Sequence, residues 1–210
     1  MRIISGIARG TKLYTLDGIN TRPTLDRIKE PLFNILNFRV QDAVVLDLFA
    51  GSGALGLESI SRGASMAIFC EHNRNAVSII EKNIEKTRFG EKSLLIKNDF
   101  EVALKQIEKN EIKLDIVFLD PPYKTDLIYK SVKRIVDLDL LNEDAIIVVE
   151  TDEPDRVQEE IKDLNVNIFD MRKYGRVSLM FLNRWNSIYL KGVANGDIYS
   201  FRNNWRFIRK

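Results

Sequence analysis

A glycine-rich turn follows the first strongly apolar run of the chain, at residues 44–48. Gly51, Gly53 and Gly56 match the spacing of the dinucleotide fingerprint G-x-G-x-x-G. Glycines between a strand and a helix let a ligand approach the backbone closely. The carboxylate of Asp47 favours one ligand over another, because it would repel a pyrophosphate and attract the ammonium and sulfonium groups of S-adenosylmethionine. The turn therefore favours a methyl donor over NAD.

The sequence Asp120-Pro121-Pro122-Tyr123 is a second candidate for chemistry. Its residue types suit methyl transfer to an exocyclic amine on a planar base, whose lone pair is delocalised into the ring. The Asp120 carboxylate and the Pro121 carbonyl would accept hydrogen bonds from the amine, so that the nitrogen lone pair points at the sulfonium methyl. The prolines hold these acceptors still, and Tyr123 would stack on the base, which is worth about 1–3 kcal/mol. The alternative is a strand that ends at proline, with Asp120 capping a turn.

Polar side chains also follow the second and third apolar runs. Glu71 is placed to accept hydrogen bonds from both ribose hydroxyls of an adenosine, a feature that NAD and S-adenosylmethionine sites share. Asn98 or Asp99 could pair with the adenine amino group, although Asp99 could equally cap a helix. Phe100 could pack on the adenine ring, but the core is favoured for it. The candidate cofactor-binding residues are Asp47, Phe49, Gly51, Ser52, Gly53, Glu71, Asn98 and Asp99.

From residue 44 onward, short apolar runs alternate with longer amphipathic stretches. Strands are expected at 44–48, 65–70, 94–96, 114–119 and 145–149, helices at 54–62, after Asn73, at 100–108 and at 127–136, and a hairpin at 166–182 around Gly175. Alternation of this kind implies right-handed crossovers and a mostly parallel sheet. The first and fourth strands of a doubly wound sheet are neighbours at the point where ligands bind. We therefore expect Asp47 and Asp120 at the same edge of the sheet.

The region before this pattern is different in character. Residues 3–4 and 13–14 predict a small hairpin, and apolar positions from Leu25 to Leu36 share one helical face. Pro31 interrupts that face and is expected to kink the helix or to start a new one, because it lacks the N–H that the helix needs.

The charge of the chain is unevenly distributed. Residues 1–39 carry a net charge of +4, residues 40–183 carry −7 and residues 184–210 carry +5. Basic ends around an acidic centre favour a polyanionic partner that the ends hold, with solvated tails as the alternative. One cysteine and one histidine exclude an internal disulfide and make a metal centre improbable. With no apolar run of membrane-spanning length and no visible secretory signal, we expect a cytoplasmic protein that needs no metal.

The segment 22–36, together with the two motifs, the opening residues 1–6 and Tyr174-Gly175, resembles the RsmD-type family of bacterial 16S ribosomal RNA guanine-N2 methyltransferases. The resemblance covers roughly residues 1–183. It implies an α/β, Rossmann-like class I methyltransferase fold with a mostly parallel seven-stranded sheet, a C-terminal antiparallel hairpin and a small N-terminal hairpin-helix extension. It also implies that the protein uses S-adenosylmethionine to methylate one guanine N2 amine of 16S ribosomal RNA, in the 30S subunit or its assembly intermediate. We expect the protein to act as a monomer.

Carried over from the family, residues Asp120, Pro121, Pro122 and Tyr123 form the reaction site. Arg22, Arg27 and Lys29 would contact RNA, with an exposed charged helix face as the alternative for the two arginines. The expected division of the chain is an RNA-contacting extension at 1–39, a methyltransferase domain at 40–183 and a basic tail of unknown role at 184–210.

Three other functions remain to be weighed against this one. An adenine-N6 methyltransferase acting on DNA or RNA shares the tetrad, but about 40 residues before the core leave little room for a recognition domain. An inactive RNA-binding assembly factor is disfavoured because Asp47, Gly51, Gly53 and Asp120 are all present. A nicotinamide oxidoreductase is disfavoured by Asp47 and lacks an evident proton donor.

Overall fold

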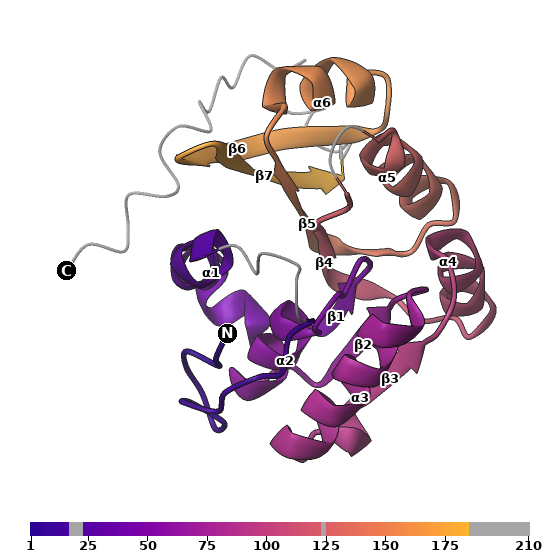
Figure 1. The fold of residues 1–210 in the computed structure, drawn as a ribbon. Helices are drawn as coiled ribbons and strands as arrows, with labels where there is room; N and C mark the ends of the chain where they lie inside the picture. The colour runs from indigo at the N-terminus through magenta and orange to yellow at the C-terminus, as the bar shows by residue number, and fades with distance from the viewer. Residues whose placement is uncertain (17–22, 123–124, 185–210) are drawn as a thin grey trace.

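The computed structural model describes residues 1–16, 23–122 and 125–184, with residues 23–27 described by their backbone only. Its centre is a seven-stranded sheet with the strand order β3-β2-β1-β4-β5-β7-β6 (Figure 1). Neighbouring strands are parallel from β3 to β5, whereas β7 is antiparallel to both β5 and β6. The strands are β1 (Val44–Asp47), β2 (Met66–Cys70), β3 (Ser93–Ile96), β4 (Leu114–Leu119), β5 (Leu141–Thr151), β6 (Val166–Tyr174) and β7 (Val177–Arg184). The predicted mostly parallel sheet with a closing hairpin is confirmed.

Helices cover both faces of this sheet. The helices are α1 (Pro23–Leu36), α2 (Ala54–Ser61), α3 (Arg74–Thr87), α4 (Phe100–Lys109), α5 (Leu127–Asp137) and α6 (Pro154–Ile161), with short 3-10 helices at Asn37–Val40 and Gly90–Lys92. One apolar core contains buried side chains of α1, α2 and α3, and a second contains those of α4, α5 and α6. The two cores lie on opposite faces, as in a doubly wound fold.

Strands β1 and β5 contain apolar runs because both of their faces meet a helix layer. Consecutive residues of β1, Val45 and Leu46, are both fully buried and belong to the two different cores. The same division separates Val148 from Val149 in β5. Strands of a parallel sheet that is covered on both sides are therefore continuously apolar rather than alternating.

Gly56 allows α2 to pack tightly on β2. A Cβ atom at this position would lie only 2.3 Å from Cε1 of Phe69, a side chain that is fully buried. The third glycine of the turn therefore serves the contact between helix and strand. This packing fixes the direction in which α2 leaves the turn.

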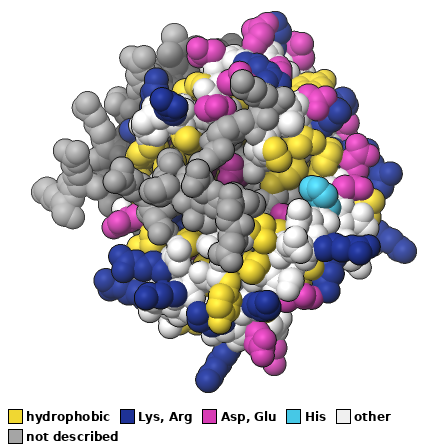
Figure 2. Space-filling view, in the orientation of Figure 1, with side chains coloured by type: hydrophobic (Ala, Val, Ile, Leu, Met, Phe, Trp, Pro, Cys, Tyr) yellow, Lys and Arg dark blue, Asp and Glu magenta, His cyan; other side chains and the backbone are white. Residues whose placement is uncertain are grey.

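Residues 1–16 form what we call the N-terminal arm. Arg2 and Lys12 form an antiparallel bridge, and the buried side chains of Ile3 and Leu13 fix the arm to the core. Figure 2 shows Lys and Arg side chains gathered over this arm, where Arg2, Arg9 and Lys12 are exposed. The predicted small hairpin thus exists, reduced to a single bridge.

Two local features differ from the sequence expectation. Helix α1 runs continuously through Pro31, so this proline does not start a new helix. Its neighbours Leu32 and Phe33 are buried, and this packing outweighs the missing hydrogen bond. Helix α6, with Pro154 at its first position, was not anticipated from the sequence. No helix in the described ranges has the length and apolar character needed to cross a membrane.

Candidate active site

The glycine turn and the tetrad meet at the carboxyl edge of the sheet. Strands β1 and β4 are parallel neighbours, with Asp47 in register with Phe118. Asp120 follows Phe118 by two residues, so both acidic residues lie where their strands end. The predicted proximity of the two motifs is confirmed.

A cavity of about 640 Å³ opens at this edge. Side chains or backbone from the ends of all four strands β1–β4 contribute to its wall. The predicted site residues that line it are Phe49, Gly51, Ser52, Glu71, Asn98, Asp99, Asp120, Pro121 and Pro122. The structure therefore collects most of the predicted donor and reaction residues around one space.

Glu71 holds the glycine turn from the end of β2. Its Oε2 accepts a hydrogen bond from the Gly51 N–H at 3.0 Å, and its Oε1 accepts one from the Asn73 N–H at 2.8 Å. The Asn73 side chain in turn caps α3 by accepting from the N–H groups of Asn75 and Ala76. Glu71 thus connects the turn after β1 with the start of α3.

Asp47 lies behind the cavity wall. Its side chain is almost completely buried, and Oδ2 accepts a hydrogen bond from the Gly56 N–H at 3.2 Å. Burial raises the pKa of Asp47 to about 7, and the carboxylates of Asp120 and Glu71 add to this rise while the Gly56 N–H opposes it. Asp47 and Gly53 are not among the residues that line the cavity. The structure gives Asp47 a contact that positions the turn rather than a place on the wall.

The end of β3 contributes both polar and aromatic groups. Asp99 lines the cavity and also caps α4, because its Oδ1 accepts a hydrogen bond from the Val102 N–H at 2.9 Å. The predicted helix cap is therefore confirmed, and pairing of Asp99 with an adenine stays a prediction. Phe100 lines the cavity as well, and the centroids of the Phe100 and Phe49 rings are 6.1 Å apart. The sequence analysis placed Phe100 in the core, where it contributes only part of its surface.

The donor groups of the glycine turn decide which cofactor fits. A pyrophosphate bound at such a turn needs free backbone N–H groups. Here the N–H groups of Gly51 and Gly56 already donate to the carboxylates of Glu71 and Asp47. The carboxylate of Glu71, which lines the cavity, suits a cation instead, and the rings of Phe49 and Phe100 in the same wall form an apolar surface that suits an adenine. The residues present fit S-adenosylmethionine.

The tetrad leaves β4 beside the same cavity. Pro121 is buried, and the Pro122 carbonyl accepts a hydrogen bond from Oγ1 of Thr125 at 2.8 Å. The Thr125 carbonyl accepts one from Nη2 of Arg156 on α6 at 3.0 Å. Arg156 of α6 is therefore linked to Pro122 through Thr125. Tyr123 lies outside the described residues.

Comparison with known proteins finds relatives over most of this chain. Ribosomal RNA small subunit methyltransferase D of Haemophilus influenzae is 35% identical over 152 residues, which is 72% of this chain and 79% of the relative. The protein of the same name from Escherichia coli K12 is 38% identical over 152 residues, which is 72% of this chain and 75% of the relative. A family model described as Conserved hypothetical protein 95 matches residues 1–183. The chain belongs to the RsmD-type methyltransferase family.

Solved structures share the RsmD-type fold. A hypothetical protein of Thermus thermophilus superposes with a TM-score of 0.71 at 27% identity, over 86% of this chain and 98% of that one. The ribosomal protein L11 methylase of Lactobacillus delbrueckii shows the fold alone, with a TM-score of 0.62 at 15% identity over 79% and 80% of the two chains. The predicted class I methyltransferase fold and the cofactor, S-adenosylmethionine, are confirmed.

Of the three residues predicted to contact RNA in this RsmD-type chain, the structure describes the side chain of Lys29. The side chains of Arg22 and Arg27 lie outside the described residues. Lys29 is buried, with 1% of its surface exposed, and its Nζ donates to the Arg2 carbonyl at 2.5 Å and lies 3.2 Å from Oε2 of Glu58. The prediction that Lys29 contacts RNA is therefore wrong. Its spacing to Leu32 and Leu36 placed it on the apolar face of α1, and this was the available signal.

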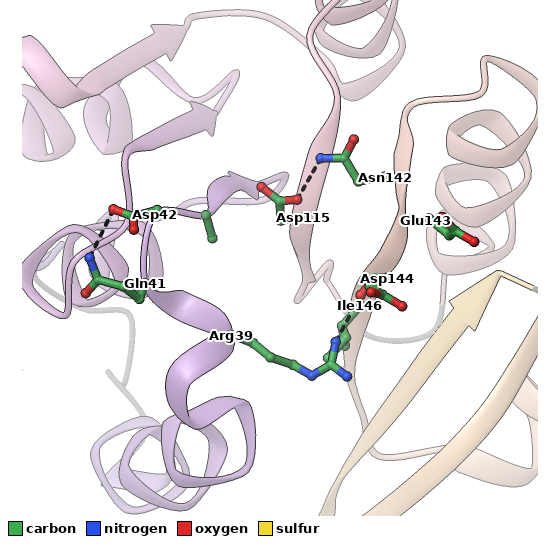
Figure 3. A pocket seen from close by; sticks show the side chains of 9 residues that line it. Arg39, Gln41, Asp42, Asp115, Asn142, Glu143, Asp144 and Ile146 are labelled. Atoms are coloured by element: carbon green, nitrogen blue, oxygen red, sulfur yellow. Dashed lines mark hydrogen bonds between the residues drawn. The ribbon is translucent and has the colours of Figure 1, made fainter.

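A second cavity, of about 340 Å³, lies at the opposite edge of the sheet (Figure 3). Asp115 accepts hydrogen bonds there from the Val44 N–H and from Nδ2 of Asn142, and Nη1 of Arg39 donates to the Asp144 carbonyl. These polar groups join the starts of β1, β4 and β5. Among the described residues, no group of three His, Cys, Asp or Glu side chains could hold a metal. The cavity is separate from the RsmD-type active site.

Proposed function

We propose that this enzyme transfers a methyl group from S-adenosylmethionine to the exocyclic N2 amine of one guanine in 16S ribosomal RNA. The observation that carries the proposal is the shared cavity, whose wall contains Glu71, the glycine turn and Asp120 with its two prolines. The names of the relatives from Haemophilus influenzae and Escherichia coli support ribosomal RNA of the small subunit as the substrate.

The reaction site would act mainly by orienting the amine. When bound, the cofactor supplies an electrophilic methyl group. The Asp120 carboxylate and the Pro121 carbonyl accept hydrogen bonds from the two N–H groups of the amine. These hydrogen bonds favour a tetrahedral nitrogen. Alignment of this kind supplies about 7–11 kcal/mol of a reaction barrier. Asp120 then holds the proton that leaves, and it need not be a strong base because the nitrogen becomes acidic once it is methylated.

The arm and the two ends of the chain would bind the RNA. Arg2, Arg9 and Lys12 are exposed on the N-terminal arm, and we propose that Arg22 and Arg27 and the basic tail at 184–210 add to this surface. The proposed substrate is the 30S particle or its assembly intermediate, met in the cytoplasm by a monomeric enzyme. Binding through phosphate contacts predicts an RNA affinity that falls as salt is added.

The experiment that tests this function compares substrates directly. Cells that lack the protein supply 30S particles, and the purified enzyme is incubated with labelled cofactor and either these particles or duplex DNA. Nucleoside analysis is expected to find N2-methylguanosine at a single position of the 16S ribosomal RNA. Label in N6-methyladenine, or no label on particles from an enzyme that binds the cofactor by calorimetry, would refute the proposal.

A further inference from the structure

The N-terminal arm forms part of the cavity wall. Met1, Thr15 and Leu16 line the cavity together with the ends of β1–β4. Thr15 and Leu16 precede β1 by nearly thirty positions, so neither the glycine turn nor the tetrad holds them in place through the chain. Some other contact must keep the arm against the cavity.

Asn83 of α3 supplies a contact directly beside Thr15, in addition to the buried side chains of Ile3 and Leu13 that hold the rest of the arm. Its side chain is completely buried, and its Oδ1 accepts a hydrogen bond from the Tyr14 N–H at 2.7 Å. Its Nδ2 donates to the Tyr14 carbonyl at 3.0 Å and to the Ser52 carbonyl at 2.9 Å. One amide therefore joins the arm, just before Thr15, to the glycine turn.

The position of Asn83 within α3 indicates that the side chain is there to make these hydrogen bonds. Asparagine is a weak helix former, and burying its amide costs free energy unless each polar atom finds a partner. Asn83 lies on the same face of α3 as Ala76 and Ile80, where an apolar residue would pack without this cost. Both N–H donors and the oxygen are satisfied by the arm and the turn.

We propose that Asn83 is a positioning residue for the methyl-donor site. Asn83 does not line the cavity. It holds the backbone of Tyr14, and so places Thr15 and Leu16 on the wall, while it also fixes Ser52 in the turn. Cofactor affinity should then depend on a buried amide that never touches the cofactor. The inference rests on cofactor binding in this cavity and does not depend on which RNA base is methylated.

The first test replaces Asn83 by aspartate. Asn83→Asp keeps the size of the side chain and the acceptor for the Tyr14 N–H, but sets an oxygen against the carbonyls of Tyr14 and Ser52. The control is Thr87→Val one turn later, because the buried Thr87 hydroxyl donates only to carbonyls of α3 itself, those of Asn83 and Ile84. Binding of S-adenosylhomocysteine is measured by calorimetry without RNA, beside the melting temperature of each variant.

We expect Asn83→Asp to weaken binding by about tenfold or more, roughly the loss of one hydrogen-bonded contact. The affinity of Thr87→Val for S-adenosylhomocysteine should stay within about twofold of that of the unchanged protein, at a loss of melting temperature similar to that of Asn83→Asp. Hydrogen exchange adds a readout of the arm: S-adenosylhomocysteine should protect the amides of residues 13–16 in the unchanged protein and not in Asn83→Asp. Equal weakening in both variants, or unchanged affinity in Asn83→Asp, would overturn the proposal.

A second variant tests the same hydrogen bond from the arm. Tyr14→Pro removes the N–H that donates a hydrogen bond to Oδ1 of Asn83, and it leaves the sequence of α3 unchanged. The Tyr14 side chain is half exposed and contributes little to the core. Weaker binding of S-adenosylhomocysteine is expected here too, so the proposal stays testable if Asn83→Asp fails to fold. Tyr14→Pro with unchanged affinity would count against it. Failure of the unchanged protein to bind S-adenosylhomocysteine would instead refute the proposed function.

Discussion

Asp47 of β1 lies in register with Phe118 of β4, and Asp120 follows Phe118 by two residues. This pairing places the turn that follows β1 and the tetrad that follows β4 at one edge of the sheet. Their carboxylates are close enough for Asp120 to raise the pKa of Asp47. A cationic cofactor and an amine substrate can therefore meet in one cavity, which is the geometric requirement for methyl transfer.

Replacing Asp120 should separate chemistry from cofactor binding. Asp120→Ala removes the carboxylate that accepts an amine hydrogen, so the turnover number should fall by about 100-fold or more. Cofactor affinity should change only a few-fold, because Glu71 and the glycine turn are untouched. Methyl transfer to 30S particles and calorimetry give the two readings. Asp126→Ala, which loses an exposed pair with Lys130, is the control, and full activity in Asp120→Ala would refute the site assignment.

Arg156 should affect turnover through the loop that follows the prolines. Its Nη2 donates to the Thr125 carbonyl, and Thr125 in turn bonds to the Pro122 carbonyl. Arg156→Ala removes this anchor, so misplacement of Asp120 and Pro121 should lower turnover by about tenfold to a hundredfold. Single-turnover kinetics at saturating cofactor measure the effect.

The matched control for Arg156 lies at the end of the same helix. Lys162 follows α6 and pairs only with the exposed Glu159 among the described contacts. Lys162→Ala should keep the rate of the unchanged enzyme, and cofactor affinity should be unaltered in both variants. An Arg156→Ala variant that turns over normally would show that the loop holds its position without α6.

The ionisation of Asp47 should be visible in the stability of the protein. Burial raises its pKa from 3.8 to about 7, so the folded state binds this proton more tightly than the unfolded chain. The contribution of Asp47 to the free energy of unfolding therefore falls as the pH rises from about 4 to about 7, and is level above that. Asp47→Asn cannot ionise and keeps an oxygen for the Gly56 N–H.

Urea unfolding between about pH 5 and pH 8 tests this prediction. The stability of Asp47→Asn, relative to the unchanged protein, should increase with pH until about pH 7 and then stay constant. Other titrating groups contribute equally to both proteins and cancel in the difference. A difference that is the same at every pH would mean that Asp47 keeps its ordinary pKa in the fold.

Glu58 should be essential for stability because it joins the arm, α1 and α2. The completely buried carboxylate accepts hydrogen bonds from the N–H groups of Ile4 and Ser5 and from Nε of Arg62, and it lies 3.2 Å from Nζ of Lys29. Glu58→Ala leaves the buried Lys29 without this counter-charge. The expected loss in the free energy of unfolding is about 3–5 kcal/mol.

An exposed ion pair provides the comparison for Glu58. Lys97 and Glu81 are paired with about half of each side chain exposed, so Lys97→Ala should change stability by about 0.5 kcal/mol or less. The double variant Glu58→Met with Lys29→Met removes both buried charges and should recover part of the loss. Urea titration measures all three, and a Glu58→Ala protein as stable as Lys97→Ala would contradict the assigned role.

Several features follow from local sequence alone. The apolar runs around Val45 and Val117 required buried strands, and Gly51 and Pro121 required that those strands end in turns. Alternation with amphipathic segments then predicted that the first and fourth strands are neighbours and that Asp47 and Asp120 lie at the same edge of the sheet. Helix α6 (Pro154–Ile161) was missed. Of the two alternatives for Pro31, the start of a new helix is excluded because α1 is continuous, with Leu32 and Phe33 packed in the core.

The sequence by itself predicted the two turns to which the proposed chemistry is assigned, because strand ends, glycines and prolines act over a few neighbouring residues. Only the tertiary structure decided that Lys29 is buried against Glu58, that Asp47 lies behind the cavity wall, and that Asn83 connects Tyr14 with Ser52. These contacts join residues that are far apart in the chain, and the free energy of a buried polar group depends on such distant partners.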